Sequence, residues 1–552
     1  MSIETLSTRL DAAITSSAAA LLDAQDADGG WPNPRESSVP CTAAAIVALH
    51  LADRPHSADL VASGIGWLAR AQNADGGWAT IAGCPTDYAA TATAVAALHQ
   101  IAPDDSEHLV RTGLKVLERW GGVTGYPDTA MIQMAGLALS LADLHDPAGL
   151  PRVPTEMVLL PGPLRRRVLA FLAVPFVTYT LLQAGQRHGN PVERMIDRIT
   201  RPVALRLLSE FTKQEGGFGS YGADPWLTGL VCTALSINGI GADQVADAVD
   251  YLRMTAQPDG SWQTLHGMQV EKVEVTGPAY VALALGKAGY ATDPRLHRAR
   301  IWLGDFQQDV GFPAYDCPPG GWTWSGAQGW PNVLDSLAVL KALAQGRSDP
   351  AVSRRLESGL DWLLARQDRR GSWSTFVRNS LLPADGPCPF STAEAVLLLL
   401  DVRTDREDPR ITRAIRWLTR HPNKDGSFSA TWHRGGVAAT AVALRALRRV
   451  GLADHPTAVR ARQWLLEAQS ADGSWGTPEE TGWALRALIG TGATDATHRA
   501  VSWLVDNQRP DGTWQPGQTG VYIRNHVHYP DHMIAQGLVL ESLVAYRDEE
   551  EP

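Results

Sequence analysis

Apolar residues recur along most of this chain with the spacing of a helix that buries one face. In the segments AVRARQWLLEAQ, from Ala458, and TGWALRALIGTG, from Thr481, they fall at positions i, i+3, i+4 and i+7. The strict alternation of apolar and polar residues that would predict β-strands is scarce. The pattern therefore predicts an all-α protein built from paired helices.

A short phrase recurs in the turns between these helices and divides the chain into repeats. It begins with glutamine or asparagine, usually continues through Asp-Gly-Gly or Asp-Gly-Ser, and ends on an aromatic ring. Glycine there supplies the positive φ that ends a helix, and the amide and indole groups can tie one repeat to the next. Helix pairs of this kind cannot bury themselves alone, so we expect them to stack in a ring or solenoid, with the phrase as structural stitching. The copies are Gln25–Trp31, Gln72–Trp78, Gln257–Trp262, Gln367–Trp373, Gln469–Trp475 and Gln508–Trp514, with weaker ones at Gln214–Phe218 and Asn423–Phe428.

Length, charge and cysteine content narrow the class of protein. A chain of 552 residues predicts two or three domains. The formal net charge of −10 argues against a nucleic-acid partner, because phosphate binding needs a basic face. The five cysteines lie far apart without a C-x-x-C pair, and the N-terminus lacks the pattern of a signal peptide. We therefore expect reduced thiols and a cytoplasmic protein.

The most apolar stretch, residues 168–183, follows directly after Arg165, Arg166 and Arg167. It contains Pro175 and is short for crossing a bilayer. Two interpretations are open: a buried helix, or peripheral contact of residues 164–183 with a membrane interface.

The Gln…Trp phrases resemble the QW motifs of squalene–hopene cyclases and bacterial class II diterpene cyclases, and this resemblance covers nearly the whole chain. It extends to four longer stretches: PTEMVLLPGPLRRR from Pro154, CPPGGWTWSGAQGWPN from Cys317, TPEETGWALRAL from Thr477 and VYIRNHVHYPDH from Val521. Protein prenyltransferase β subunits share such repeats, but the Asp/Cys/His zinc site that they require has no clear counterpart here.

The resemblance implies two α/α-barrel domains in the βγ arrangement of class II terpene cyclases. Residues 1–18 with 271–552 would form the β-type barrel, which carries the presumed active-site motif. Residues 19–270 would form the inserted γ-type barrel. The substrate cavity implied by the family lies between the two barrels.

The same resemblance implies a reaction that begins when a carboxylic acid protonates an alkene or epoxide. The family uses D-x-D-D at a helix start for this purpose, because alkenes are weakly basic and the acid must be held protonated. Here the matching positions read Asn332-Val333-Leu334-Asp335, so Leu334 replaces the family's proton donor. Asp335 remains as a catalytic or orienting carboxylate, with Asn332 beside it. An alternative interpretation is that these two residues only cap a helix.

Other residues are candidates for supporting roles in this chemistry. Glu274 is a candidate relocated acid, although a solvated turn would also explain it. Asp385 stands where the family places polar partners of the acid, but the family's Asp-His pairing is missing. His433 would be a base that quenches the final cation, or a structural hydrogen-bond former. Aromatic residues that would line the cavity, or simply pack, are Trp322, Trp324, Trp330, Trp432, Tyr522 and Tyr529.

Metal-dependent chemistry has little support in the sequence. His526, His528 and His532 lie in HVHYPDH, where H-x-H spacing without nearby cysteine is a weak zinc signal. Asp104-Asp105 lies on a predicted loop and does not form the D-D-x-x-D motif of metal-triggered cyclases. We therefore expect neither a metal site nor a cofactor, with Mg²⁺ involved only if the substrate is a diphosphate.

Two functions follow as hypotheses. The first is a class II-like terpene cyclase that acts on a linear C15–C30 isoprenoid, such as squalene or geranylgeranyl diphosphate, with a non-standard acid. The alternative is a catalytically silent terpenoid-binding or partner protein derived from a cyclase, an idea that Leu334 supports.

Overall fold

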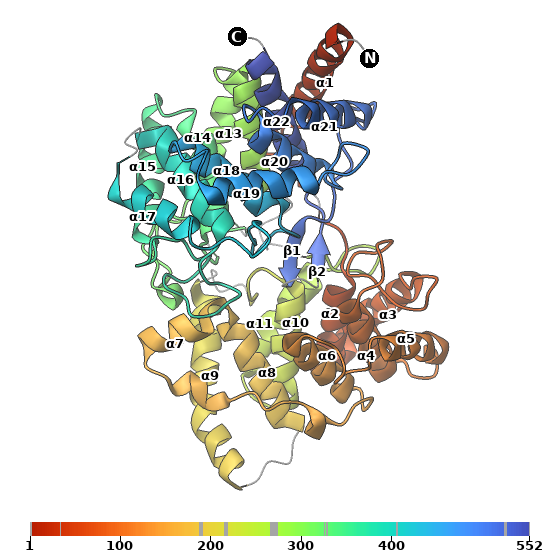
Figure 1. Cartoon of the computed structure of the whole chain (residues 1–552). Coiled ribbons are helices and arrows are strands. Elements are labelled where there is room, and N and C mark those ends of the chain that lie inside the picture. The colour runs from red at the N-terminus through yellow and green to blue at the C-terminus, as the bar shows by residue number, and fades with distance from the viewer. Residues whose placement is uncertain are drawn as a thin grey trace. The chain divides into compact units, whose positions relative to one another are not determined.

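The computed structural model describes residues 3–33, 35–186, 191–214, 219–264, 274–324, 326, 329–403, 407–523 and 527–550. Regular structure in these ranges is almost entirely helical, which confirms the all-α prediction (Figure 1). The exception is a short antiparallel pair, β1 (Gly520–Ile523) and β2 (Val527–Tyr529).

The chain divides into two compact units. Unit 1 comprises Met1–Pro34 and Glu271–Pro552, and unit 2 comprises Arg35–Val270. The first boundary therefore lies after Pro34, later than the residue 18 that we expected. A break at residue 18 would cut α1 (Ile3–Asp23), and the turn after α1 also belongs to unit 1, because Gln25 Nε2 donates to the Arg295 carbonyl at 3.0 Å.

Unit 1 is a ring of inner helices wrapped by outer ones. Each inner helix contacts the next, and the last closes onto the first. The inner helices are rich in alanine and leucine and are buried on most faces, whereas the outer ones bury one face only, as an α/α barrel requires. The inner ring is α12 (Thr276–Leu285), α14 (Val333–Ala344), α16 (Pro389–Arg403), α18 (Val437–Arg449), α20 (Pro478–Leu488) and α22 (His532–Glu550). The outer layer is α1, α13 (Pro294–Asp305), α15 (Pro350–Ala365), α17 (Pro409–Leu418), α19 (Pro456–Glu467) and α21 (Thr494–Asp506).

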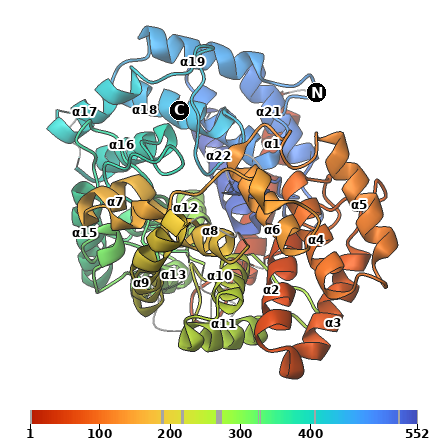
Figure 2. The same ribbon diagram turned by 90° about the horizontal axis from the view of Figure 1, so that it is seen from below.

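Unit 2 repeats this plan with a second closed ring (Figure 2). Its inner helices are α2 (Val39–Ala52), α4 (Tyr88–Ile101), α6 (Thr129–Leu141), α8 (Ala173–Gln186) and α10 (Pro225–Ile237). Its other helices are α3 (Arg54–Arg70), α5 (Glu107–Arg119), α7 (Gly162–Leu169), α9 (Pro191–Gln214) and α11 (Ala242–Met254). Short helical turns are η1 (Pro147–Gly149), η2 (Thr155–Leu159) and η3 (Ala170–Leu172) in unit 2, and η4 (Gly286–Tyr290) and η5 (Pro313–Tyr315) in unit 1.

The repeated phrase ties neighbouring helices together. Gln72 Nε2 donates to the carbonyls of Gly76, at 2.8 Å, and Leu109, at 3.1 Å, so it links its own turn to the next outer helix. The Trp78 indole is fully buried and donates to the Leu68 carbonyl at 2.8 Å. In unit 1, Gln508 Nε2 donates to the Ala13 carbonyl at 2.9 Å and joins the end of α21 to α1. The repeat is structural, as its position in the turns predicts.

Residues Gly162–Gln186 contain the apolar stretch 168–183 noted in the sequence. By length and composition alone they are suited to crossing a membrane, with a mean hydropathy of 1.7, and half of the most apolar window is buried. The helical path is interrupted at η3, where Ala170 has a φ of 45°. One side of this segment thus packs inside unit 2, while residues such as Leu164 remain exposed.

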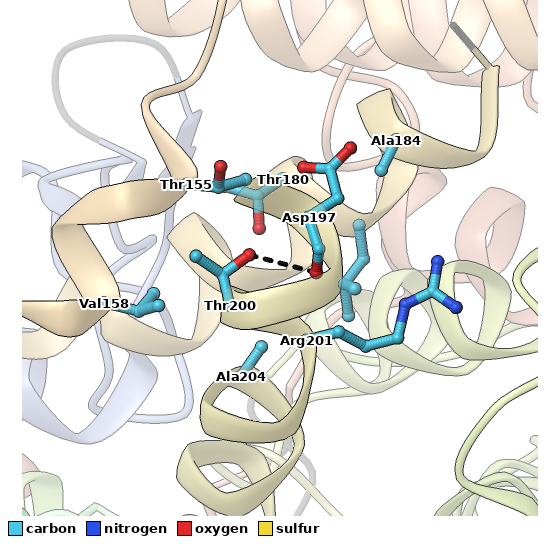
Figure 3. A pocket seen from close by; sticks show the side chains of 9 residues that line it. Thr155, Val158, Thr180, Ala184, Asp197, Thr200, Arg201 and Ala204 are labelled. Carbon is cyan, nitrogen blue, oxygen red and sulfur yellow. Dashed lines mark hydrogen bonds between the residues drawn. The ribbon is translucent and has the colours of Figure 1, made fainter. Parts of the chain in front are cut away.

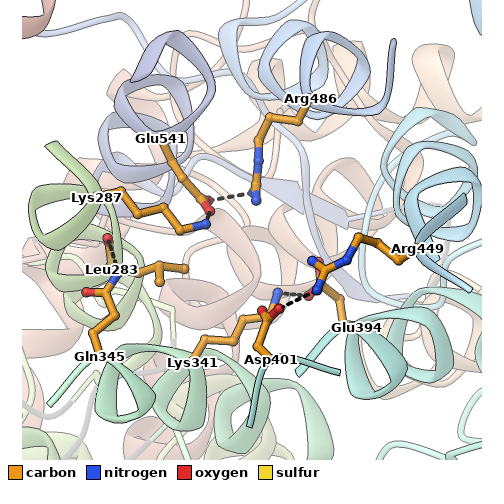
Figure 4. A network of polar contacts seen from close by, with 9 residues as sticks. All are labelled: Leu283, Lys287, Lys341, Gln345, Glu394, Asp401, Arg449, Arg486 and Glu541. Carbon is orange, nitrogen blue, oxygen red and sulfur yellow. Dashed lines mark hydrogen bonds and ion pairs between the residues drawn. The ribbon is translucent and has the colours of Figure 1, made fainter. Parts of the chain in front are cut away.

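A network of mostly buried charges lies among the inner helices of unit 1, with Lys287 at its exposed edge (Figure 4). Glu541 is almost completely buried and accepts from Lys287 Nζ and Arg486 Nη1, each at 2.5 Å. Lys341 pairs with Glu394 in the same network. Burial alone would raise the pKa of Glu541, but Arg486, Lys287 and Arg445 together hold it well below its usual range. With Arg445 in α18, each inner helix of unit 1, or the turn directly after it, supplies a charged residue to the network. In the order of the helices these are Lys287, Lys341, Glu394, Arg445, Arg486 and Glu541.

Candidate functional site

The inner helices of unit 1 all start at one end of the ring, because an outer helix returns the chain after each of them. Polar side chains gather at these starts, where unpaired backbone N–H groups favour negative charge. The candidate site is therefore this end of the unit 1 ring.

Asp335 lies at the start of α14 and is held from two sides. Thr276 Oγ1, at the start of α12, donates to Asp335 Oδ1 at 2.6 Å, and Asn332 Nδ2 donates to Oδ2. Asn332 also caps the helix, because its Oδ1 accepts from the Asp335 N–H at 3.0 Å. The capping interpretation is thus confirmed for Asn332, and the Asp335 carboxylate has a separate partner on another helix. Asp335 is 8% exposed, while Leu334, in the position of the family's acid, is half-buried.

Glu274 acts as a helix cap in this structure. Its carboxylate accepts from the backbone N–H groups of Thr276, at 2.6 Å, and Gly277, at 3.1 Å, and from Asn33 Nδ2 at 2.7 Å. Asn33 Nδ2 also approaches the Asp531 carboxylate at 3.2 Å, which caps α22 by accepting from the Ile534 N–H. Sequence reasoning missed Asn33 and Asp531, because no local signal pairs residues almost 500 positions apart.

These carboxylates are not arranged as a metal site. The oxygens of Glu274 and Asp531 face N–H donors, which is the geometry of helix caps. Among the residues that the structure describes, no group of three or more His, Cys, Asp and Glu side chains is placed to hold a metal. Of the histidines noted in the sequence, His528 lies in β2 and His532 begins α22, whereas His526 falls outside the described ranges.

Asp385 is completely buried in the segment between α15 and α16. Its Oδ1 accepts from the Phe376 N–H at 2.6 Å and its Oδ2 from the Val377 N–H at 3.0 Å. Burial raises the pKa of Asp385 to about 7, against the opposing effect of these donors and of Ser380. The carboxyl group is therefore available in both protonation states near neutral pH.

Phe376 and the rings around it among the described residues form a group, which we call the aromatic cluster: Tyr315, Trp324, Trp330, Phe376 and Trp432. Phe376 lies at its centre, with ring centroids 5.7 Å from Tyr315, 5.7 Å from Trp324, 6.5 Å from Trp330 and 5.8 Å from Trp432. The structure thus brings together three of the predicted tryptophans. It adds Tyr315 and Phe376, which sequence reasoning did not select.

The other aromatic candidates are not among the rings around Phe376. Trp322 is fully buried and its indole donates to the Leu303 carbonyl at 2.8 Å, as the repeat tryptophans do. Its repeat begins at Gln307, which donates to the Gly320 and Arg355 carbonyls at 2.9 Å; an insertion hid this copy in the sequence. Tyr529 lies in β2 with its ring against Gly520. The Tyr522 backbone is in β1, but its side chain lies outside the described part of the structure.

His433 lies before α18 and packs between two rings. Its centroid is 4.1 Å from Phe390 and 5.0 Å from Trp483, the latter at right angles. Burial lowers the pKa of His433 to about 4, so the imidazole is neutral at physiological pH. Its Nδ1 is buried and has no hydrogen-bond partner among the described residues. Because burial disfavours the protonated ring, His433 is a weak base that accepts a proton only from a strong acid.

Glu479 is a further buried acid at the same end of the ring. It is completely buried at the start of α20, and its carboxylate accepts from the Gly517 N–H at 3.0 Å. Burial raises the pKa of Glu479 to about 7. Sequence reasoning passed over it because the Thr477–Glu480 pattern is typical of a helix cap, and Thr477 Oγ1 does accept from the Glu480 N–H.

A small pocket in unit 2 lies between η2, α8 and α9 (Figure 3). It encloses about 300 Å³ of space, including its solvent-facing part, and Asp197 and Arg201 lie on its wall. Thr200 Oγ1 is bonded within α9, to the Asp197 carbonyl at 3.3 Å. None of the predicted site residues lines this pocket.

Comparison with known proteins identifies the class. The model of the squalene-hopene cyclase N-terminal domain matches residues 14–170, and that of the squalene-hopene cyclase C-terminal domain matches residues 273–535. The solved structure of ent-copalyl diphosphate synthase from Streptomyces platensis superposes with a TM-score of 0.59 and 20% identity, covering 98% of this chain and 99% of that one. The fold is that of the class II terpene cyclases.

Full-length relatives agree with this class. A probable squalene–hopene cyclase of Sinorhizobium fredii is 24% identical over 89% of this chain and 89% of its own length. The squalene–hopene cyclase of Alicyclobacillus acidocaldarius is 26% identical over 87% of this chain and 88% of its own. The chain belongs to the squalene–hopene cyclase family.

Proposed function

We propose that this protein cyclises a linear C15–C30 isoprenoid by protonation, with Asp335 as the acid. The observation that carries the proposal is the placement of Asp335 at the start of α14, held by Thr276 and Asn332. The residue after Asn332, Val333, donates its N–H to the Thr375 carbonyl at 3.0 Å, next to Phe376 of the aromatic cluster. An acid and a set of cation-stabilising rings therefore share one end of the ring.

In the proposed reaction Asp335 first takes up a proton, and its O–H bond then breaks as a C–H bond forms at the terminal double bond. The resulting tertiary cation is attacked by the next double bond, and each closure moves the charge along the chain. Aromatic quadrupoles of the cluster stabilise these cations, and the apolar surroundings keep water away. His433 takes a proton from the last cation, which restores a double bond and leaves the substrate's formula unchanged.

Three linear isoprenoids that span the C15–C30 range serve as substrates for a test. The purified full chain is incubated separately with squalene, geranylgeranyl diphosphate and farnesyl diphosphate, and the products are analysed by mass spectrometry. We expect a cyclic isomer of one of them. Asp335→Asn should lower its rate by about 100-fold or more, the usual contribution of a general acid. Asp361→Asn, an exposed change of the same kind on α15, is the matched control. Equal turnover in Asp335→Asn and the control would remove Asp335 from the mechanism.

A second candidate function is favoured by Leu334. The position of the family's acid carries a side chain that cannot donate a proton, which fits a terpenoid-binding or partner protein without turnover. That protein would be stabilised thermally by a prenyl compound while no substrate is consumed. Thermal unfolding measured with the same three compounds distinguishes it from the cyclase.

We further propose that the protein works in the cytoplasm in peripheral contact with a membrane. Arg165–Arg167 lie in α7 beside exposed Leu159 and Leu164. The neighbouring α9 exposes Val192, Met195 and Ile199, among arginines that would attract anionic lipid. Co-sedimentation with phosphatidylglycerol vesicles, and weaker binding to phosphatidylcholine, is the expected result. The same amount of protein in the pellet with and without vesicles would contradict the proposal.

A further inference from the structure

Asp385 has an unusual relation to the chain that precedes it. Its two carboxylate oxygens accept from two consecutive backbone N–H groups, those of Phe376 and Val377. Its own carbonyl accepts from the Thr375 N–H at 3.2 Å. A segment of three residues is thus fixed by one buried acid, with no side-chain contact to water.

The first consequence concerns the aromatic cluster. Phe376 is the ring that contacts all the other members, so its position sets the distances within the cluster. Because Asp385 holds the Phe376 N–H at 2.6 Å, a change in this bond moves the central ring.

The second consequence concerns the helix that carries Asp335. The Thr375 carbonyl accepts from the N–H of Val333, the first residue of α14, and Thr375 Oγ1 accepts from the Trp432 indole at 2.9 Å. The segment fixed by Asp385 therefore contacts both the start of the acid's helix and a second ring of the cluster.

We propose that Asp385 is a positioning residue, which acts through the backbone of residues 375–377 to hold the aromatic cluster and the start of α14 in one fixed relation. The inference rests on the proposed function, because an acid and cation-stabilising rings must face the same substrate. Both oxygens of the Asp385 side chain are used, because each of the two N–H groups bonds a different one. Asparagine has one oxygen and one NH₂ group, so its NH₂ group would face one of the two N–H donors and that hydrogen bond would be lost.

The test compares Asp385→Asn with Asp87→Asn in the full chain. Asp87 also accepts from two backbone N–H groups, those of Thr80 at 2.6 Å and Ala90 at 2.8 Å, but it lies in unit 2. The first measurement is near-ultraviolet circular dichroism, which reports the packing of tryptophan rings and needs no turnover. We expect the tryptophan signal to change in Asp385→Asn, with the far-ultraviolet spectrum unchanged, and to be kept in Asp87→Asn.

The second measurement is the product mixture from geranylgeranyl diphosphate. In Asp385→Asn we expect the ratio of incompletely cyclised to complete product to rise by about tenfold, because misplaced rings stabilise the later cations less. A merely structural role would lower all products in proportion. Phe376→Leu, which removes the central ring and leaves Asp385 in place, should shift the ratio in the same direction and covers the case in which Asp385→Asn does not fold.

The two readouts separate the two proposals. If the wild type converts none of the three isoprenoids, the proposed function fails, and the near-ultraviolet spectra alone decide whether Asp385 orders the cluster. An unchanged spectrum in folded Asp385→Asn overturns the inference. So does an unchanged product ratio in an active Asp385→Asn variant.

Discussion

Glu541→Gln should strongly destabilise unit 1, because it removes a carboxylate from a buried excess of positive charge. Glu541 accepts two charge-assisted hydrogen bonds, from Lys287 and Arg486 (Figure 4). The positive charge of Arg445 acts on it as well. The bond from buried Arg486 contributes about 1.5–3 kcal/mol, whereas the Lys287 side chain is 42% exposed and its bond adds only about 0–1 kcal/mol, so the expected loss is about 2–4 kcal/mol. Breaking a buried ion pair from one side costs about 3–5 kcal/mol, which agrees.

The assay is reversible urea unfolding followed by the far-ultraviolet signal, with thermal unfolding as support. The expected loss corresponds to a fall of roughly 3–6 °C in Tm, because the entropy of unfolding grows with chain length and unit 1 has more than 300 residues. Glu357→Gln, an exposed change of the same kind on α15, should alter stability by less than about 0.5 kcal/mol. Lys287→Met combined with Glu541→Gln should be less destabilising than the sum of the single changes, because it removes a cation that has lost its partner. A loss below about 1 kcal/mol in Glu541→Gln would refute the reasoning, since it would show that the network is hydrated in solution.

Three further predictions concern the end of the ring where the candidate site lies. The pKa values of Asp385 and Glu479 are raised to about 7, so both groups take up protons on folding between their ordinary pKa values and 7. Their contribution to the free energy of unfolding therefore falls as pH rises through that window and is constant above it. The free energy of unfolding of the wild type minus that of the double variant Asp385→Asn/Glu479→Gln is measured by urea unfolding from pH 5 to 8. This difference should fall as the pH rises to about 7 and then stay constant. A difference that does not depend on pH would contradict the prediction. Leu334→Asp restores the family's acid and should raise turnover of the preferred isoprenoid about tenfold or more; turnover at the wild-type level would show that Leu334 does not limit the rate. His433→Phe keeps an aromatic ring in place but removes the group that accepts the proton. We expect mass spectra to show a product with a different double-bond position or with added water. An identical product would exclude His433 as the base.

Local features of the fold were readable from the chain alone. Helical periodicity, the glycine turns and the capping role of Asn332 each depend on residues a few positions apart, and the structure confirms them. The resemblance carried by the repeats identified the family. One copy of the repeat, from Gln307 to Trp322, was hidden because an insertion separates the glutamine from its glycines.

The composition of the candidate site was decided only by tertiary structure. Ring closure brings Thr276 to Asp335, Asn33 to both Glu274 and Asp531, and Phe376 to the centre of the aromatic cluster. Burial, which no local pattern specifies, gives Asp385 and Glu479 their raised pKa values and His433 its lowered one. The sequence by itself determines which helices form and how their turns end, because these depend on neighbours along the chain. Which polar groups meet at the starts of the inner helices depends on how the ring closes, since that closure joins residues hundreds of positions apart.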